Sequence, residues 1–153
     1  MLRARIDVYK RQSLPTITVY ASTANNDARP LRTIGPESQL YYPQGGIVVD
    51  AKGEILVTNA GYSRAGVLVF ARRARGDDKP IRTISGSKTQ ITNNVDGLAL
   101  DSVGSIYVTA SSGSSGPGSV LVFTPTAKGN VPPIREIVGT KTGLVAPAGI
   151  AVR

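Results

Sequence analysis

Few side chains in this sequence of 153 residues could do chemistry, and histidine and cysteine are absent from it. Without them, these residues hold no Ser–His–Asp or Cys–His nucleophile set and no thiolate metal site. One group stands out, because Asn93, Asn94 and Asp96 carry the oxygen donors that a hard divalent cation prefers. The same residues suit a polar turn that enters a strand, and the group occurs in one place only. We therefore expect a turn here and no metal site.

Two aspartates recur in one local pattern. Asp50 is followed by Gly53 three residues later, and Asp101 is followed by Gly104 at the same spacing. Asp at the first position and Gly at the fourth are typical of a type I turn, in which the carboxylate accepts nearby backbone N–H groups. We predict that both carboxylates form turns rather than a reactive site.

These turns belong to a repeat of about 50 residues, a period found in propellers and comparable arrays. Residues 17–20 (Ile-Thr-Val-Tyr) recur as 67–70 and 120–123, both Val-Leu-Val-Phe. Residues 30–34 (Pro-Leu-Arg-Thr-Ile) recur in the same way as 80–84 and 133–137. The chain is therefore one array of similar units.

Each unit is expected to hold four short strands, because runs of Val, Ile, Leu and Tyr alternate with Gly, Pro, Asn and Ser. The central strands are apolar on both faces, which predicts sheets that are covered on both sides. Repeated four-stranded antiparallel sheets of this kind are typical of β-propeller blades. The expected strands are 46–50, 54–59, 66–71 and 80–85 in one unit, and 97–101, 105–110, 119–124 and 133–138 in the next.

The predicted fold is thus all-β, a β-propeller fragment with two complete blades. These are residues 45–85 and 96–138. Residues 17–34 would give the last two strands of a preceding blade, and residues 148–153 the first strand of a following one. Such an arc leaves apolar flanks exposed at its ends. We expect the missing blades to belong to a longer parent chain, with a homo-oligomer that completes the ring as the alternative.

Residues 1–12 match no part of the repeat. The codons GAT GTG TAT AAG AGA CAG would encode residues 7–12, and this string resembles the end of a transposase adapter used in preparing sequencing libraries. We therefore expect residues 1–12 to be an artefact outside the fold, with a disordered basic leader as the alternative. The propeller part is then 13–153, a piece of a longer protein from which any upstream signal peptide has been lost.

Three segments resemble the NHL-type and related six-bladed, TolB-like propeller repeats. Residues 43–50 and 147–152 resemble the Pro-x-Gly-Ile-Ala-Val-Asp strand of these repeats. Residues 104–110 resemble the Gly-x-Ile-Tyr-Val-x-Asn strand, except that Ala110 replaces the usual Asn or Asp. The resemblance runs from Ile17 to the end of the chain and implies the scaffold, whose residues many functions share. A secreted or periplasmic location is implied by the resemblance alone.

The resemblance also implies where a ligand would bind. In such propellers the loops after the second and fourth strands share one face around the central channel, and that face usually holds the site. We therefore expect a non-catalytic scaffold that presents this face to a protein or a small molecule. The residues that its loops offer are Tyr41, Tyr42, Tyr62, Arg64, Lys88, Asp96 and Lys141.

Two other functions stay open. Gluconolactonase-like propellers hold a divalent metal over the channel with Glu, Asn and Asp from several blades, whereas here only residues 93–96 supply such donors. Some NHL propellers bind single-stranded RNA, for which Tyr41, Tyr42 and Tyr62 could stack on bases while Arg64, Lys88 and Lys141 meet phosphates. We expect no catalytic residues, no cofactor and no nucleic acid partner.

The charge pattern supports the last expectation. The formal net charge is +8, but residues 1–12 contribute part of the excess. The densest basic run, 72–75, lies in a loop on the opposite face beside Asp77 and Asp78, and a solvated loop explains it. Arg32, Arg82 and Arg135 recur in the outer strand, where we expect them to protect the sheet edge. No apolar run is long enough for a membrane-spanning helix.

Overall fold

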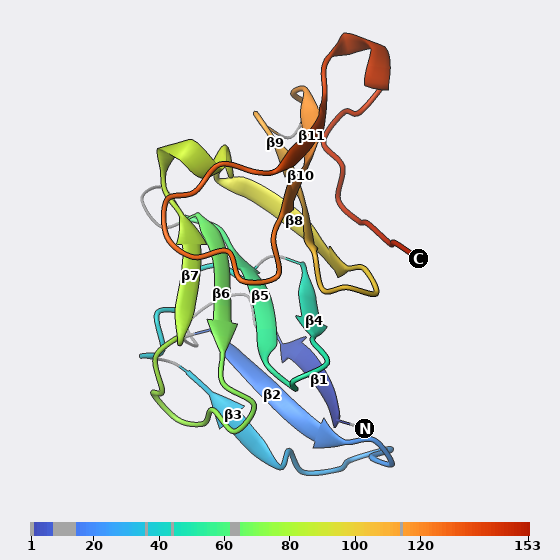
Figure 1. Ribbon diagram of the computed structural model, residues 1–153. Helices are drawn as coiled ribbons and strands as arrows, with labels where there is room; N and C mark the ends of the chain where they lie inside the picture. Colours follow the sequence, from blue (N-terminus) through green and yellow to red (C-terminus); the bar gives the residue numbers. More distant parts are fainter. Residues whose placement is uncertain (1, 8–14, 36, 44, 62–64, 114) are drawn as a thin grey trace.

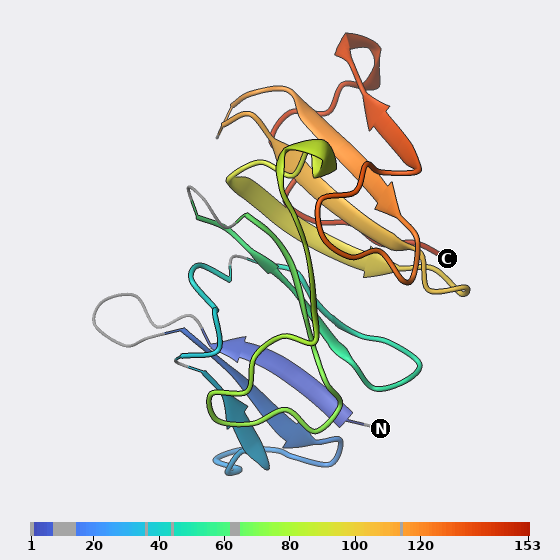
Figure 2. The same cartoon turned by 60° about the vertical axis from the view of Figure 1, so that its left-hand side comes forward.

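The computed structural model describes residues 2–7, 15–35, 37–43, 45–61, 65–113 and 115–153. These residues form three antiparallel β-sheets and two short 3₁₀ turns, and they contain no α-helix. The sheets follow one another along the chain and lie side by side (Figures 1 and 2). Among these residues, no helix has the length and apolarity needed to cross a membrane.

The first sheet has the order β1-β2-β3, and the other two have four strands in chain order. The first comprises β1 (Leu2–Asp7), β2 (Thr16–Ala21) and β3 (Arg32–Ile34). The second comprises β4 (Ile47–Val49), β5 (Ile55–Asn59), β6 (Gly66–Phe70) and β7 (Arg82–Ser85). The third comprises β8 (Asn94–Leu100), β9 (Ile106–Ser111), β10 (Gly118–Phe123) and β11 (Arg135–Val138). The 3₁₀ turns are η1 (Ser87–Thr89) and η2 (Thr140–Thr142). The two predicted four-stranded antiparallel sheets are therefore confirmed.

The second sheet is covered on both faces, as its sequence predicts. Every residue of β5 and β6 is buried. Because side chains alternate along a strand, Ile55 and Val57 join the core shared with the first sheet, whereas Leu56 joins the core shared with the third. The two cores are therefore built by neighbouring sheets that cover each other.

The predicted turns are also confirmed. The Asp50 Oδ1 atom accepts the N–H groups of Lys52 and Glu54 at 2.9 and 2.8 Å, and Gly53 has a φ of +81°. The Asp101 Oδ1 atom accepts the N–H groups of Val103 and Ser105 at 3.1 and 2.8 Å. The two turns have the same hydrogen bonds, so the repeat is conformational as well as sequential.

Backbone pairing joins the first sheet to the loop after β6, and the second sheet to the loop after β10. The Gly35 N–H donates to the Gly76 carbonyl and the Gly76 N–H donates to the Thr33 carbonyl, both at 2.7 Å. The same pair of bonds recurs at Gly129. The Ser85 N–H donates to the Gly129 carbonyl at 3.2 Å, and the Gly129 N–H donates to the Thr83 carbonyl at 2.6 Å. Gly76 and Gly129 have φ values of +52° and +73°, a left-handed conformation that glycine adopts easily.

Side chains reinforce this pairing from both directions. The Arg32 Nε atom donates to the Ala74 carbonyl at 3.0 Å, and the Arg82 Nη1 atom donates to the Ala127 carbonyl at 3.0 Å. In return, the Asp77 carboxylate accepts the Glu37 N–H at 3.2 Å, and the Asn130 side chain accepts the Lys88 N–H at 2.7 Å. We call this set of contacts the interlock: the paired glycine, the arginine that reaches the loop, and the Asp or Asn that caps the sheet end.

The interlock corrects the expectation for the outer-strand arginines. Arg32 and Arg82 do not protect an open edge, because their guanidinium groups bind carbonyls of the next sheet's loop, including Arg72 O for Arg32. Burial, and then the charge of Arg72, lower the pKa of the Arg32 guanidinium. Among the described residues no sheet follows β11, and Arg135 instead donates to the Tyr107 hydroxyl at 2.7 Å.

Residues 2–7, which were expected to lie outside the fold, have a place in the first sheet. These form β1, which pairs with β2 from Leu2↔Ala21 to Asp7↔Thr16. The edge of β2 offers unpaired backbone groups, and an extended segment satisfies them whatever its origin. The first sheet therefore has three strands and not two. Residues 8–12 lie outside the described part of the chain.

The expectation for the end of the chain also needs correction. Residues 148–153 form no strand, because the described part of the chain offers no further strand to pair with them. They nevertheless lie beside the third sheet: the Ile150 N and Cγ2 atoms are 3.1 Å from where a Cβ atom on Gly97 would stand. Residues 148–153 therefore lie next to β8 in the same way as β8 lies next to β4.

The interlock predicts a stability cost at Arg82. Replacing Arg82 with Ala removes the bond to Ala127 and the ion pair with Glu54 at 3.5 Å, so we expect the free energy of unfolding to fall by about 1–2 kcal/mol. Urea denaturation measures this change. Arg73→Ala removes the same charge from an exposed site and should change stability by less than about 0.5 kcal/mol. Equal losses in both variants would contradict the interlock.

Candidate functional site

The clearest presented side chains are two adjacent tyrosines in the loop before β4. Tyr41 and Tyr42 are 60% and 58% exposed. Their backbone N–H groups both donate to the Asn59 Oδ1 atom, at 2.8 and 3.2 Å, and the Tyr42 carbonyl accepts the Ala60 N–H at 2.8 Å. Asn59 ends β5 and is only 1% exposed. A buried amide therefore fixes the backbone of a loop whose aromatic rings face solvent.

Asp96 is held by the residue next to Asn59. The buried Thr58 hydroxyl donates to the Asp96 carbonyl at 3.1 Å and accepts the Gly46 N–H at 3.0 Å. A Cβ atom on Gly46 would stand 2.6 Å from that carbonyl, so only glycine lets β4 approach β8 so closely. The end of β5 thus organises three of the predicted site residues: Tyr41, Tyr42 and Asp96.

The other predicted residues do not join this group. Lys88 and Lys141 are exposed on η1 and η2, at equivalent places in the loops after the second and third sheets. No described contact links either lysine to the tyrosine loop. Tyr62 and Arg64 lie outside the described residues. The seven predicted residues therefore include one organised group and two separate lysines.

The oxygen donors considered for a metal lie at the start of a strand. β8 begins at Asn94, and its register shifts between Val95 and Leu98, so Asp96 lies in an irregular stretch of the ladder. Asn93 and Asn94 are exposed. Within the described ranges, no three His, Cys, Asp or Glu side chains gather in a way that could hold a metal ion.

A cavity of about 390 Å³ opens beside the loops that were expected to bind a ligand. It lies where the loop after β7 passes the start of β6. Its described lining comprises Ala65, Gly86, Ser87, Gln90, Ile91, Thr92 and Asn93. One residue considered from the sequence, Asn93, belongs to this described lining, whereas Tyr41 and Tyr42 do not.

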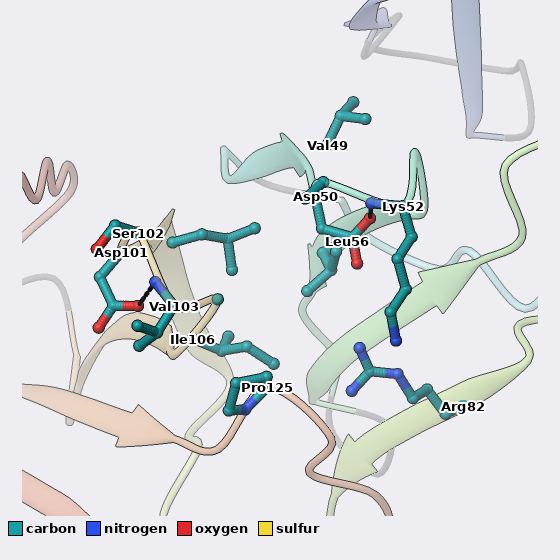
Figure 3. Close-up of a pocket in the computed structure, with 13 residues that line it drawn as sticks. Val49, Asp50, Lys52, Leu56, Arg82, Asp101, Ser102, Val103, Ile106 and Pro125 are labelled. Atoms are coloured by element: carbon teal, nitrogen blue, oxygen red, sulfur yellow. Dashed lines mark hydrogen bonds between the residues drawn. The ribbon is translucent and has the colours of Figure 1, made fainter.

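A second cavity, of about 370 Å³, lies on the opposite loop face and was not predicted (Figure 3). It opens between the two equivalent turns, and Val49, Leu56, Leu100, Ile106 and Pro125 form apolar walls. Lys52 and Arg82 line one side and point toward one another (Figure 3). The sequence shows only that the turn recurs, and this recurrence does not predict a cavity between the two turns.

The carboxylates of this second cavity are occupied by their own turns. Asp101 accepts hydrogen bonds from Val103, Ser105 and the Tyr107 hydroxyl. Desolvation alone would raise the pKa of the Asp101 carboxyl, but the hydrogen bonds from Ser105, Val103 and Tyr107 hold that pKa below its ordinary value. Arg82 is paired with Glu54. The two carboxylates and the guanidinium group that line this cavity are therefore already engaged in contacts within the fold.

Comparison with known proteins adds no identity: no protein-family model matches this chain, and no curated protein matches it.

The role of Asn59 predicts a local loss of order in a variant. Asn59→Leu leaves the Tyr41 and Tyr42 N–H groups without their acceptor, so we expect a loss of about 1–3 kcal/mol in stability. We also expect hydrogen exchange at those two amides to become at least about tenfold faster, because a lost bond of that size has this effect. Asn94→Ala, at an exposed site, is the control and should leave both amides unchanged. Unchanged exchange in Asn59→Leu would show that the loop is held by other contacts.

The lowered pKa of Asp101 predicts a pH dependence of stability. The carboxylate stabilises the folded chain at neutral pH, and this contribution disappears as pH falls through the folded-state pKa, below about pH 4. Asp101→Asn should therefore be less stable than the wild type at neutral pH, and the difference should shrink in acid. Ser102→Asn in the same turn should keep the wild-type profile. Urea titrations at several pH values measure this, and a difference that stays constant would refute it.

Proposed function

We propose that this chain is a non-catalytic scaffold of the β-propeller type, which binds a protein ligand through the loop face that carries Tyr41 and Tyr42. The proposal has three parts: the propeller arrangement, the binding face and the absence of catalysis. Each has its own support.

The propeller arrangement is supported by the repetition of contacts between sheets. Three antiparallel sheets, two of them four-stranded, pack flank to flank in chain order. The same interlock joins the first sheet to the second and the second to the third. β4 and β8 approach each other at Gly46, and residues 149–152 continue that row beside Gly97. An inner row of first strands is the arrangement that blades adopt around a central axis.

The observation that carries the binding face is the pair of exposed tyrosine rings on a backbone fixed by buried Asn59. Tyrosine is enriched at interfaces because its ring has a large contact area, a polar end and few rotatable bonds. Holding the loop in advance lowers the entropy that binding would otherwise cost. The site is therefore suited to a partner that covers both rings.

The proposal of no catalysis is supported by the structural work that the recurring charged residues already do. Asp50 and Asp101 each accept two backbone N–H groups of their turn. Arg32 and Arg82 bind carbonyls of the next sheet. These recurring groups stabilise the scaffold.

Selection of peptides from a random display library tests the binding face. The wild-type chain is the only target of the selection, and the selected peptides are then measured on the variant Tyr41→Ser, Tyr42→Ser. We expect selected peptides to bind the wild type and to lose at least tenfold in affinity on the double variant, which is about 1.4 kcal/mol. Val103→Ser is the matched control, because Val103 is 75% exposed in a turn on the opposite face. The Val103→Ser variant should bind the selected peptides with the same affinity as the wild type.

Two results would overturn the proposal. Selected peptides that bind the double variant as tightly as the wild type would show that the tyrosines are not the anchor. Hydrolysis of a sugar lactone by the purified chain, dependent on an added divalent cation, would show that the scaffold is an enzyme.

A further inference from the structure

The interlock occurs twice within the chain, and each of its two halves occurs once more at an end of the row of sheets. The half contributed by a fourth strand recurs at β11. The half contributed by the loop after β6 or β10 recurs in the loop after β2, which is the equivalent strand of the first sheet. Within the described residues, neither of these extra halves meets its counterpart.

The half at β11 is exposed to solvent, whereas the equivalent residues of β3 and β7 are covered by the next sheet. Ile137 corresponds to Ile34 and Ile84, which are 0% exposed, whereas Ile137 is 47% exposed. All four residues of β11 are exposed. Arg135 corresponds to Arg32 and Arg82; it has no loop carbonyl to bind, and its guanidinium lies 5.6 Å from the centre of the Tyr107 ring. This end presents an apolar flank with an arginine beside it.

The half after β2 is already folded in the required form. The Ala24 N–H donates to the Ala21 carbonyl at 3.0 Å, and the equivalent bonds from Ala74 and Ala127 are 2.9 and 3.1 Å. Asn26 has a φ of +47°, close to the +52° of Gly76, and asparagine is among the few residues that adopt this conformation readily. Asp27 follows, as Asp77 follows Gly76.

The exposure of this loop matches that of β11. Ala24 is exposed, whereas its equivalents Ala74 and Ala127 are 2% and 7% exposed because a neighbouring sheet covers them. No hydrogen bond joins the Asp27 carboxylate to another described residue. The loop is thus formed, and nothing in the described chain covers it.

The first strand of a sheet shows the same complementarity. The first sheet lacks a strand at the place that β4 and β8 take in the other sheets. Residues 149–152 (Gly-Ile-Ala-Val) repeat the sequence pattern of those strands, lie beside β8 and pair with no strand. Residues 149–152 therefore offer the element that the first sheet lacks.

We propose that the two ends bind each other between two copies of this chain. Residues 149–152 of one copy pair with the free edge of β1 in the second, and the loop after β2 of the second copy forms the interlock with β11 of the first. In that interlock Arg135 binds the Ala24 carbonyl, Asn26 pairs with the backbone of β11, Asp27 caps the N–H of Lys141, and the loop covers Ile137. A second copy is the chosen occupant because this chain carries both halves.

The contact is head-to-tail, so it must either close into a ring or continue as a filament. The described residues of one copy form three sheets, so two copies provide six. Propellers have roughly four to eight blades, and two copies fall within that range while one or three do not. The dimer size therefore rests on the propeller arrangement proposed above, whereas the pairing of the two ends rests on the interlock.

Sedimentation velocity of the full chain over a hundredfold range of concentration tests this inference. We expect a dimer for the wild type. Ala24→Arg blocks the loop half and Ile137→Arg blocks the β11 half, and each should raise the dimer dissociation constant at least a hundredfold. Leu31→Arg is the matched control: Leu31 is 61% exposed and its equivalents Ile81 and Ile134 are 49% and 63% exposed, so it should dimerise like the wild type. Circular dichroism should show all three variants folded, since each change is at an exposed site.

Mixing the two blocked variants gives a sharper test. An Ala24→Arg copy keeps a working β11 half, and an Ile137→Arg copy keeps a working loop half. The mixture should therefore form dimers through one intact interface, although neither variant dimerises alone. A monomeric wild type would overturn the inference, and the partner of β11 would then be a sheet of a different protein. Dimers that neither variant weakens would also overturn the inference. Peptide binding at Tyr41 and Tyr42 in a monomeric variant would show that the proposed function survives such a failure.

Discussion

The structure depends on one constraint: a sheet whose central strands are apolar on both faces must have a neighbour on each side. β5 and β6 are buried at every residue, and the first and third sheets supply the cover. Burying a side chain such as Val, Leu or Ile contributes about 1.5–3 kcal/mol, so an uncovered flank is costly along its whole length. In the described part of the chain the second sheet has a neighbour on each side, and the first and third sheets have one neighbour each.

Apolar packing alone does not fix how two sheets sit against each other, because it has no direction. The interlock supplies the direction. Gly76 and Gly129 pair with the backbone of the preceding sheet at defined residues, and Arg32 and Arg82 bind the carbonyls two residues before these glycines. The cost of leaving those carbonyls and N–H groups unpaired on burial makes a slipped arrangement unfavourable. The core therefore drives association, and the interlock sets its register.

Local patterns made most of the fold predictable from the sequence. The strands and the Asp50 and Asp101 turns follow from short-range alternation and turn chemistry, and the structure has them. The role of Arg82 could not be predicted, because its partner is a backbone carbonyl 45 residues away, and a carbonyl has no sequence pattern. The pairing of β1 with β2 was missed for a similar reason: an open edge accepts segments that do not belong to the repeat. At the site, the resemblance predicted the tyrosines as binding residues. Their backbone hydrogen bonds to Asn59 could not be predicted, because they join two segments that are separated along the chain.

The same constraint separates the tyrosine loop from the ends of the molecule. Tyr41 and Tyr42 are held by Asn59 of β5, in the sheet that is covered on both flanks within one chain. Their geometry is therefore set before any second copy arrives, and binding there does not require assembly. The ends have the opposite character, since the Ala24 loop and β11 are formed but uncovered, and their burial requires another molecule. A ligand that bound only the tyrosine loop would leave a monomer–dimer equilibrium unchanged, because a ligand shifts an equilibrium only when it binds the two states with different affinity.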